Sequence, residues 1–140
     1  MRVAVVTEYY PRAGDPVLGM WAHRQALAAV DAGADVRVIV LYRPIPPMRT
    51  PRRELFGATR DALRQPRHTE LDGIPVHYVR FVSPQRDRSY GSWGRWASPS
   101  LAAALRRLRR DFAYDLVHAH NAVPAGDALA VGLGQIIPLQ

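Results

Sequence analysis

The first forty residues contain two short apolar runs with a helix-forming stretch between them. The runs at residues 3–6 and 36–41 are rich in β-branched side chains, as strands buried on both faces require. Residues 9–16 carry two prolines and a glycine and predict a loop, whereas residues 20–32 are mostly helix formers. Gly33 follows where a helix commonly ends on a left-handed residue. This order predicts a βαβ crossover with two parallel strands under one helix.

The stretch from residue 43 to residue 70 interrupts this rhythm because it is rich in proline and arginine. We expect a long excursion there, with a short helix at residues 53–63. Asp72–Gly73 then predicts a turn, and residues 76–82 alternate between apolar and polar well enough to form a third strand.

A longer helix is predicted to begin at Ser98–Pro99, an N-cap residue followed by a proline suited to the first turn. Its apolar stripe consists of Leu101, Leu105, Leu108 and Phe112. Its opposite face carries Arg106, Arg107, Arg109 and Arg110. These arginines come late in the helix, where cations oppose the negative end of the helix dipole, so their first explanation is structural.

The last part of the chain repeats the alternation of strands and helices. We expect a fourth strand at residues 115–120, a helix at 124–133, and the start of a fifth strand at 135–140. The pattern predicts an α/β protein with a Rossmann-like, doubly wound, mostly parallel sheet in one domain at residues 1–140. Such a domain does not normally finish on an apolar strand without a covering helix, so we expect the chain to be truncated.

The composition excludes several classes of protein. Apolar residues make up 48% of the chain and charged residues 22%, as in ordinary water-soluble domains. There is no cysteine, which excludes disulfides, thiolate catalysis and zinc–cysteine sites. All 19 basic residues are arginine, which excludes a Schiff-base lysine and a P-loop lysine in this chain. Apolar runs are too short for a membrane span or a signal peptide, and we expect a cytoplasmic location.

The net charge of +7 is concentrated in two stretches, residues 49–67 and 106–110. A basic surface attracts anionic membranes, phosphorylated substrates or nucleic acid. A solvated basic face without a partner explains the same pattern.

Glycine and aspartate stand in the loop after the first predicted strand. Gly14, Asp15 and Gly19 precede a helix N-terminus, where free N–H groups favour an anion such as a diphosphate. Plain turn residues are the alternative interpretation. The loop is not a G-x-G-x-x-G motif, because residues 9–11 occupy the tight turn that a dinucleotide needs.

Two histidines and an asparagine end the fourth predicted strand. Alternation puts His118 and His120 on the same side of that strand, with Asn121 following. A metal site is disfavoured because the nearest carboxylates, Asp115 and Asp127, do not complete a ligand set. For His120 we favour a cleft position, in contact with a sugar hydroxyl or a leaving phosphate. His118 fits that role or that of a core histidine.

These segments, in this order and spacing, resemble the family 4 retaining glycosyltransferases. The resemblance rests on the loop that ends at residues 15–19, the helix that begins with residues 20–27, and the strand at residues 115–120. The P-V-x-G loop ahead of an aromatic residue and R-Q-A is similar to the branch that includes teichuronic-acid and other surface-polysaccharide transferases. The resemblance implies the N-terminal, acceptor-side half of a glycosyltransferase-B fold.

The family implies transfer of a sugar, with retention, from a nucleotide-diphosphate donor to a glycan or lipid-linked acceptor. It implies no metal and no other cofactor. Gly19 would then lie near the donor phosphates and His120, the catalytic candidate, near the transferred sugar, with Arg24 or Arg12 toward the diphosphate. The family's donor-binding domain is absent from this sequence, so the chain alone is expected to be inactive.

Within the family the N-terminal domain receives the acceptor, often at a membrane surface. The proline- and arginine-rich excursion would serve that contact, which places the protein at the inner face of the cell membrane. The alternative function is a non-enzymatic basic domain that binds nucleic acid or a protein partner.

Overall fold

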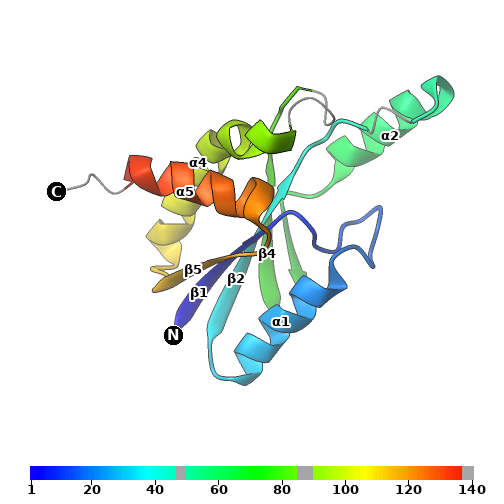
Figure 1. Cartoon of the computed structure of the whole chain (residues 1–140). Coiled ribbons are helices and arrows are strands. Elements are labelled where there is room, and N and C mark those ends of the chain that lie inside the picture. The colour runs from blue at the N-terminus through cyan, green and yellow to red at the C-terminus, as the bar shows by residue number, and fades with distance from the viewer. Residues whose placement is uncertain (47–49, 85–89, 137–140) are drawn as a thin grey trace.

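The computed structural model describes residues 1–46, 50–84 and 90–136, and their main feature is a five-stranded sheet (Figure 1). The strands are β1 (Arg2–Thr7), β2 (Asp35–Tyr42), β3 (His68–Leu71), β4 (Ile74–Arg80) and β5 (Leu116–Ala119). The helices are α1 (Met20–Asp31), α2 (Arg52–Arg64), α4 (Trp93–Asp111) and α5 (Asp127–Ile136). Short helical turns at Tyr90–Ser92 and Ala122–Gly126 precede the last two helices.

The sheet has the strand order β3-β4-β2-β1-β5. β1 pairs in parallel with β2 and β5, β2 pairs in parallel with β4, and only β3 runs antiparallel to its neighbour β4. The predicted α/β class with a mostly parallel, Rossmann-like sheet is therefore confirmed. The parallel strands all end at one edge of the sheet, which we call the carboxyl edge.

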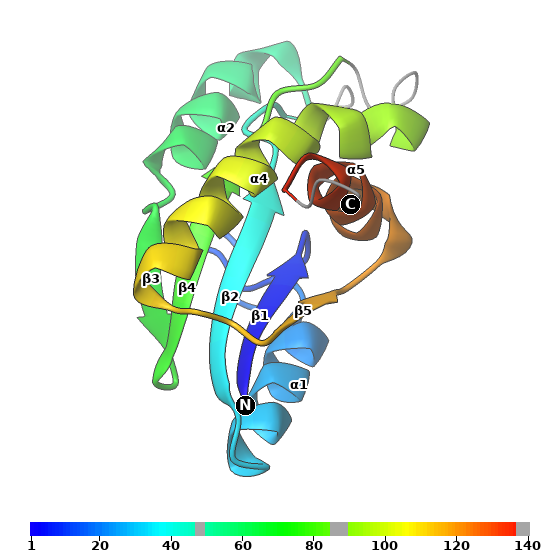
Figure 2. The same cartoon turned by 90° about the vertical axis from the view of Figure 1, so that its left-hand side faces the viewer.

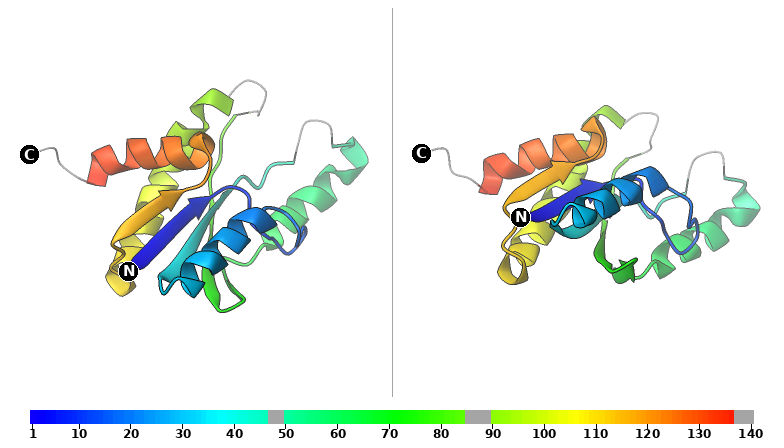
Figure 3. Two further views of the ribbon diagram at one scale, coloured as in Figure 1. Left: turned by 60° about the horizontal axis from the view of Figure 1, so that its bottom comes forward. Right: turned by 90° about the horizontal axis from the view of Figure 1, so that it is seen from below.

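Helices cover both faces of the sheet, as Figures 2 and 3 show, with α1 on one face and α4 and α5 on the other. Successive residues of β1 alternate between these layers. Val3 and Val5 pack with Ala22 of α1, whereas Ala4 and Val6 pack with Leu101 of α4. Burial on both sides explains why this strand reads as a continuous apolar run.

The prediction that the irregular excursion continues to residue 70 was wrong, because β3 and β4 form a hairpin that begins at residue 68. Residues 68–71 form an antiparallel edge strand on β4. The turn between the two strands is Asp72–Gly73, with φ of 49° and 79°, and positive φ at both central residues suits the right-handed twist of a hairpin. The turn was predicted, but a polar strand of four residues has no apolar alternation that would reveal it.

The predicted start of α4 at Ser98–Pro99 was also wrong, because the helix begins at Trp93 and Pro99 lies inside it. Trp93 is 2% exposed, and its ring packs at 72° to Phe81 with 5.7 Å between the ring centroids. Burial of a side chain of this size stabilises the turns ahead of the proline and outweighs the hydrogen bond that Pro99 cannot donate. The predicted leucine stripe is buried, and Phe112 packs in the same cluster just beyond the helix end.

The end of the described chain differs from prediction as well. The expected helix at residues 124–133 is present as α5, but α5 continues through Ile136, where a strand was expected to begin. An apolar run alone does not distinguish a buried strand from a buried helix. The rest of the predicted strand, residues 137–140, lies outside the described residues.

Candidate functional site

The carboxyl edge of the sheet gathers the predicted site residues from two loops. The loop after β1 runs from Glu8 to Gly19 and leads into α1, and the loop after β5 begins at His120. Ligands of open parallel sheets bind at this edge, because helix N-termini and strand ends meet there. β1 and β5 are paired neighbours, so both loops emerge at the same part of the edge.

Gly19 is fixed by a close contact between two stretches of backbone. It is the N-cap residue of α1 with φ of 66°, and a Cβ atom placed on it would lie 2.2 Å from the carbonyl carbon of Tyr9. Only glycine accepts both the left-handed backbone and this approach. The residue therefore brings the N-terminus of α1 against the end of β1, and no side chain caps that N-terminus.

Gly14 and Asp15 lie in an exposed turn of the same loop. A Cβ atom on Gly14 would have no heavy atom within 4 Å. The Asp15 carboxylate accepts a hydrogen bond from the Leu18 amide at 3.2 Å, and the backbone of Asp15 pairs with that of Arg12. The contacts of Gly14 and Asp15 are those of turn residues, while Gly19 has a specific steric role.

His118 and His120 lie together, as the alternation of the strand predicted. Their ring centroids are 4.6 Å apart. His118 is exposed, which excludes the core position that was open for it, whereas His120 is 7% exposed. The backbone amide of His120 donates to the Val6 carbonyl at 2.8 Å and so fixes the residue at the end of β1.

Trp21, in the first turn of α1, completes this group. Its ring meets that of His120 edge to face, with centroids 5.1 Å apart, and 47% of Trp21 stays exposed. The pKa of His120 is lowered mainly by burial, and the nearby His118 is the second cause. His120 is therefore neutral at pH 7, with one ring nitrogen that donates and one that accepts a hydrogen bond.

The structure places the other two predicted ligand-binding residues at the margin of this group. Arg24 is exposed and lies three residues after Trp21, on the same side of α1. Asn121 follows His120 in a left-handed conformation with φ of 70°, and its carbonyl accepts a hydrogen bond from Gly126 at 3.0 Å. The structure thus brings together His118, His120 and the N-terminus of α1.

Arg12, the alternative to Arg24 for the diphosphate, is held inside its own loop. Its guanidinium donates to the Glu8 carbonyl at 2.7 Å and stands over the Tyr42 ring at 5.5 Å. Burial lowers the pKa of Arg12, against the effect of Glu8, which raises it. These contacts favour a role in shaping the loop.

A hydrogen-bonded network around the buried His23, which the sequence did not reveal, connects α1 to the β3–β4 hairpin. Nδ1 of His23 lies 2.6 Å from the Tyr10 hydroxyl, and Nε2 lies 2.8 Å from an oxygen of Asp72. A carboxylate only accepts hydrogen bonds, so Nε2 donates to Asp72; in the neutral form of the ring, Nδ1 then accepts from Tyr10. Burial raises the pKa of Tyr10, which keeps this hydroxyl protonated. His23 thus fixes the rotation of α1 that directs Trp21 toward His120.

The carboxylates nearest in sequence to the two histidines point elsewhere. Asp115 pairs with Arg2 at 3.2 Å at the opposite end of β5, and this partner lowers the pKa of Asp115. Asp127 lies against α4, since a Cβ atom on Gly94 would be 1.9 Å from its carboxylate oxygen. Within the described part of the chain, no group of three or more potential metal ligands occurs.

Comparison with known proteins identifies the family. Residues 5–139 match the family described as Glycosyl transferase 4-like domain, and the chain belongs to this family. It is 31% identical over 137 residues to the "Putative teichuronic acid biosynthesis glycosyltransferase TuaC" of Bacillus subtilis (strain 168). The alignment covers 94% of this chain and 32% of that protein, so the chain spans about a third of its relative. No solved structure matches the chain.

Proposed function

We propose that the chain is the acceptor-side, N-terminal part of an enzyme that transfers a sugar, with retention, from a nucleotide-diphosphate donor to a glycan or lipid-linked acceptor. The observation that carries this proposal is the position of His120 at the carboxyl edge, beside the uncapped N-terminus of α1. Membership of the family supports sugar transfer in general. The name of the relative supports surface-polysaccharide synthesis as the process.

Each part of this edge has a chemical task in the proposal. The bond from the sugar's anomeric carbon to the diphosphate breaks, an acceptor oxygen bonds to the same face of that carbon, and the proton of the acceptor hydroxyl passes to the departing diphosphate. The N-terminus of α1 favours the negative charge that develops on the departing diphosphate. Neutral His120 binds a hydroxyl of the transferred sugar. The remainder of the donor site belongs to a domain outside this chain, and the chain alone is inactive.

The test uses the full-length protein that contains this chain, incubated with a panel of nucleotide-diphosphate sugars and a lipid-linked or glycan acceptor. We expect acceptor-dependent release of nucleoside diphosphate, a product with the donor's anomeric configuration by NMR, and activity that persists in EDTA. An inverted product or inhibition by EDTA would contradict the mechanism. Absence of transfer with every donor would contradict the proposed function.

We further propose that α2 attaches the enzyme to an anionic membrane surface. None of its residues is buried, and the helix projects from the rest of the molecule (Figure 1). Phe56 is 80% exposed, and Leu63, seven residues later on the same face, is 49% exposed. The helix also carries Arg52, Arg53, Arg60 and Arg64. A basic helix with an apolar face is the composition of helices that lie in a membrane interface.

Two further observations bear on this contact. Among the described helices, none is long and apolar enough to cross a membrane. Glu54 and Asp61 lie beside Arg53 and Arg60, at 3.4 and 3.7 Å, and offset part of the positive charge. Arg49, in the same basic stretch of sequence, lies outside the described residues.

The α2 contact predicts a selective loss of vesicle binding. Arg53→Ala with Arg64→Ala removes two charges that each contribute about 1 kcal/mol near an anionic surface, so binding should weaken about 30-fold. Phe56→Ser should weaken it further by removing apolar contact. Co-sedimentation with phosphatidylglycerol vesicles measures both. The matched control is Arg106→Ala with Arg110→Ala on α4, which removes the same charge elsewhere. Equal losses in the two double variants would mean attraction by net charge alone and would contradict a specific role of α2.

A further inference from the structure

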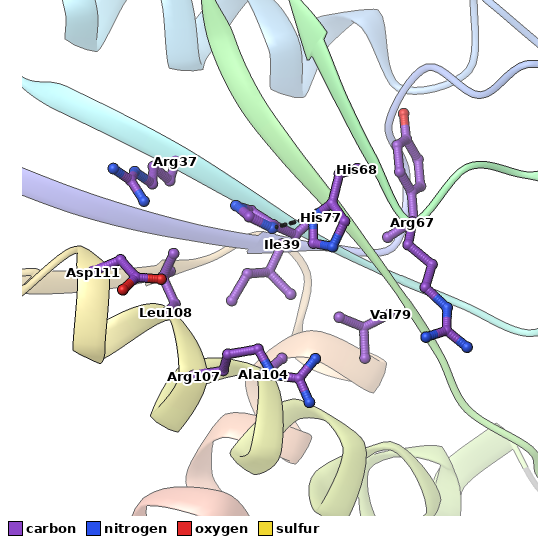
Figure 4. Close-up of a pocket in the computed structure, with 11 residues that line it drawn as sticks. Arg37, Ile39, Arg67, His68, His77, Val79, Ala104, Arg107, Leu108 and Asp111 are labelled. Carbon is purple, nitrogen blue, oxygen red and sulfur yellow. Dashed lines mark hydrogen bonds between the residues drawn. The ribbon is translucent and has the colours of Figure 1, made fainter.

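A cavity lies on the α4 side of the sheet, away from His120. It has a volume of about 170 Å³ and lies between the C-terminal half of α4 and the strands β2 and β4. Its apolar wall is formed by Ile39, Val79, Ala104 and Leu108 (Figure 4). Ile39 and Leu108 belong to the core cluster beneath α4, so this wall is anchored in the fold. A cavity of about 150 Å³ accepts a benzene molecule, so a compact ligand fits here.

Three arginines from separate elements line this cavity: Arg37 of β2, Arg67 just before β3, and Arg107 of α4. Among the described residues, none of the three guanidinium groups forms an ion pair. The guanidinium of Arg37 stands over the Phe112 ring, with 4.4 Å to the centroid. Asp111 is the one acidic residue in the lining. Three cations and one carboxylate leave two positive charges that no side chain of the lining neutralises.

A histidine pair lies in the middle of this lining. His68 and His77 face each other across β3 and β4, and their Nδ1 atoms are 2.8 Å apart. One Nδ1 must donate and the other accept, so at least one of the rings is neutral. The pKa of His77 is lowered mainly by burial, and in smaller part by His68 and Arg37. His77 is therefore a neutral ring at pH 7.

The remaining nitrogen of His77 lacks a partner. Its Nε2 atom is shielded from solvent and forms no hydrogen bond with any described residue. If His77 accepts from His68, then Nε2 carries a proton that needs an acceptor. A buried polar atom without a partner is destabilising. Because Nε2 is shielded from solvent, an oxygen of a bound anion reaches it only if the side chains that cover it move. Figure 4 shows the side chains of Arg37, Arg67 and Arg107 on different sides of the histidine pair.

We propose that this cavity is a binding site for a phosphate monoester, separate from the sugar-transfer site. A phosphate monoester carries between one and a half and two negative charges at neutral pH, which matches the two unneutralised charges of the lining. Guanidinium groups bind phosphate oxygens with paired hydrogen bonds. The apolar wall accommodates the first carbons of the esterified group. A monocarboxylate would leave one positive charge without compensation.

The test is calorimetric titration of the full-length protein with glycerol 3-phosphate and with inorganic phosphate. We expect saturable binding with one site per chain. Arg107→Gln and Arg67→Gln should each weaken it about tenfold or more, the effect of losing a charge-assisted hydrogen bond. The control is Arg106→Gln, the neighbouring arginine of α4 that does not line the cavity, which should bind as the unchanged protein does.

Two results would overturn the proposal. One is no saturable binding at millimolar concentrations of either compound. The other is an equal loss in Arg106→Gln and Arg107→Gln, which would indicate diffuse attraction along α4. The NMR signals of the His77 ring provide an independent check, because they should shift on binding in Arg106→Gln at the concentrations that suffice for the unchanged protein, whereas in Arg107→Gln the same shift should need about ten times more ligand.

A competition experiment identifies the source of the phosphate. Vesicles with phosphatidic acid, a lipid phosphate monoester, should displace glycerol 3-phosphate if the site accepts lipid headgroups, and should leave it bound if the site accepts soluble esters. Either result supports phosphate-monoester binding, provided that Arg107→Gln weakens the binding of glycerol 3-phosphate. Failure of sugar transfer would not affect these titrations, because they do not measure activity.

Discussion

Gly19→Ala should destabilise the protein more than any other single glycine replacement in the β1–α1 loop, by about 3 kcal/mol or more. Two effects add. An L-residue at φ of 66° is strained, and the new Cβ would lie 2.2 and 2.3 Å from the carbonyl carbon and oxygen of Tyr9. Both of these atoms belong to the backbone at the end of β1, so no side-chain rotation relieves the contact. Urea unfolding followed by circular dichroism measures the loss.

Replacements of two other glycines measure the cost of backbone strain separately from the cost of the steric contact. Gly33 has φ of 87°, but a Cβ atom placed on it would have no heavy atom within 4 Å, so Gly33→Ala should cost only the strain of about 1–2 kcal/mol. Gly14 has neither constraint, and Gly14→Ala should change stability by less than about 0.5 kcal/mol. A Gly19→Ala variant no less stable than Gly33→Ala would show that the approach of α1 to Tyr9 is not needed.

This steric role of Gly19 connects the fold to the site. Gly19 sets how close α1 comes to β1, and the contact of His23 with Tyr10 and Asp72 sets how α1 is rotated. Both constraints act within one turn of Trp21, the residue of α1 that meets His120. The position of His120 relative to the N-terminus of α1 is therefore determined by packing contacts, before any substrate binds.

The sequence predicted the parallel part of the sheet because its strands are buried on both faces. Residues 3–6 and 36–41 must be apolar throughout, and the helix between them leaves few other connections. The sequence did not predict β3, an edge strand of mostly exposed residues without apolar alternation. It also placed the start of α4 at Pro99, because the buried packing of Trp93 that extends the helix is a tertiary effect.

The candidate site was predictable to the extent that strand geometry determines it. Because successive side chains of a strand point to opposite faces, the sequence predicted His118 and His120 on one side of β5, and their rings are in contact in the structure. Their different burial could not be predicted, because it depends on Trp21 and on the end of β1. The Tyr10–His23–Asp72 network joins residues far apart in sequence, and no local spacing indicates it.

If the full-length protein is the transferase we propose, His120→Ala should reduce its kcat by about 100-fold, the usual effect of removing one hydrogen-bond donor that acts in a transition state. The matched control is His118→Ala, because His118 is exposed and lies beside His120 with its centroid 4.6 Å away. That variant should keep activity within about threefold, since a substitution at the surface leaves His120 in place. Both are measured as nucleoside diphosphate release at saturating donor and acceptor.

The pH profile distinguishes a chemical role of His120 from a purely structural one. Burial lowers the pKa of His120, so the ring becomes protonated at a lower pH than an ordinary histidine does. Activity that depends on the neutral ring should therefore persist to a lower pH than an ordinary histidine would allow, and decline as the pH falls through this lowered pKa. His120→Gln keeps a donor and an acceptor but cannot be protonated, so it should retain more activity than His120→Ala and lose this acidic limb. If His120→Gln showed the same acidic limb as the unchanged enzyme, another group would be responsible, and His120 would act only by packing against Trp21.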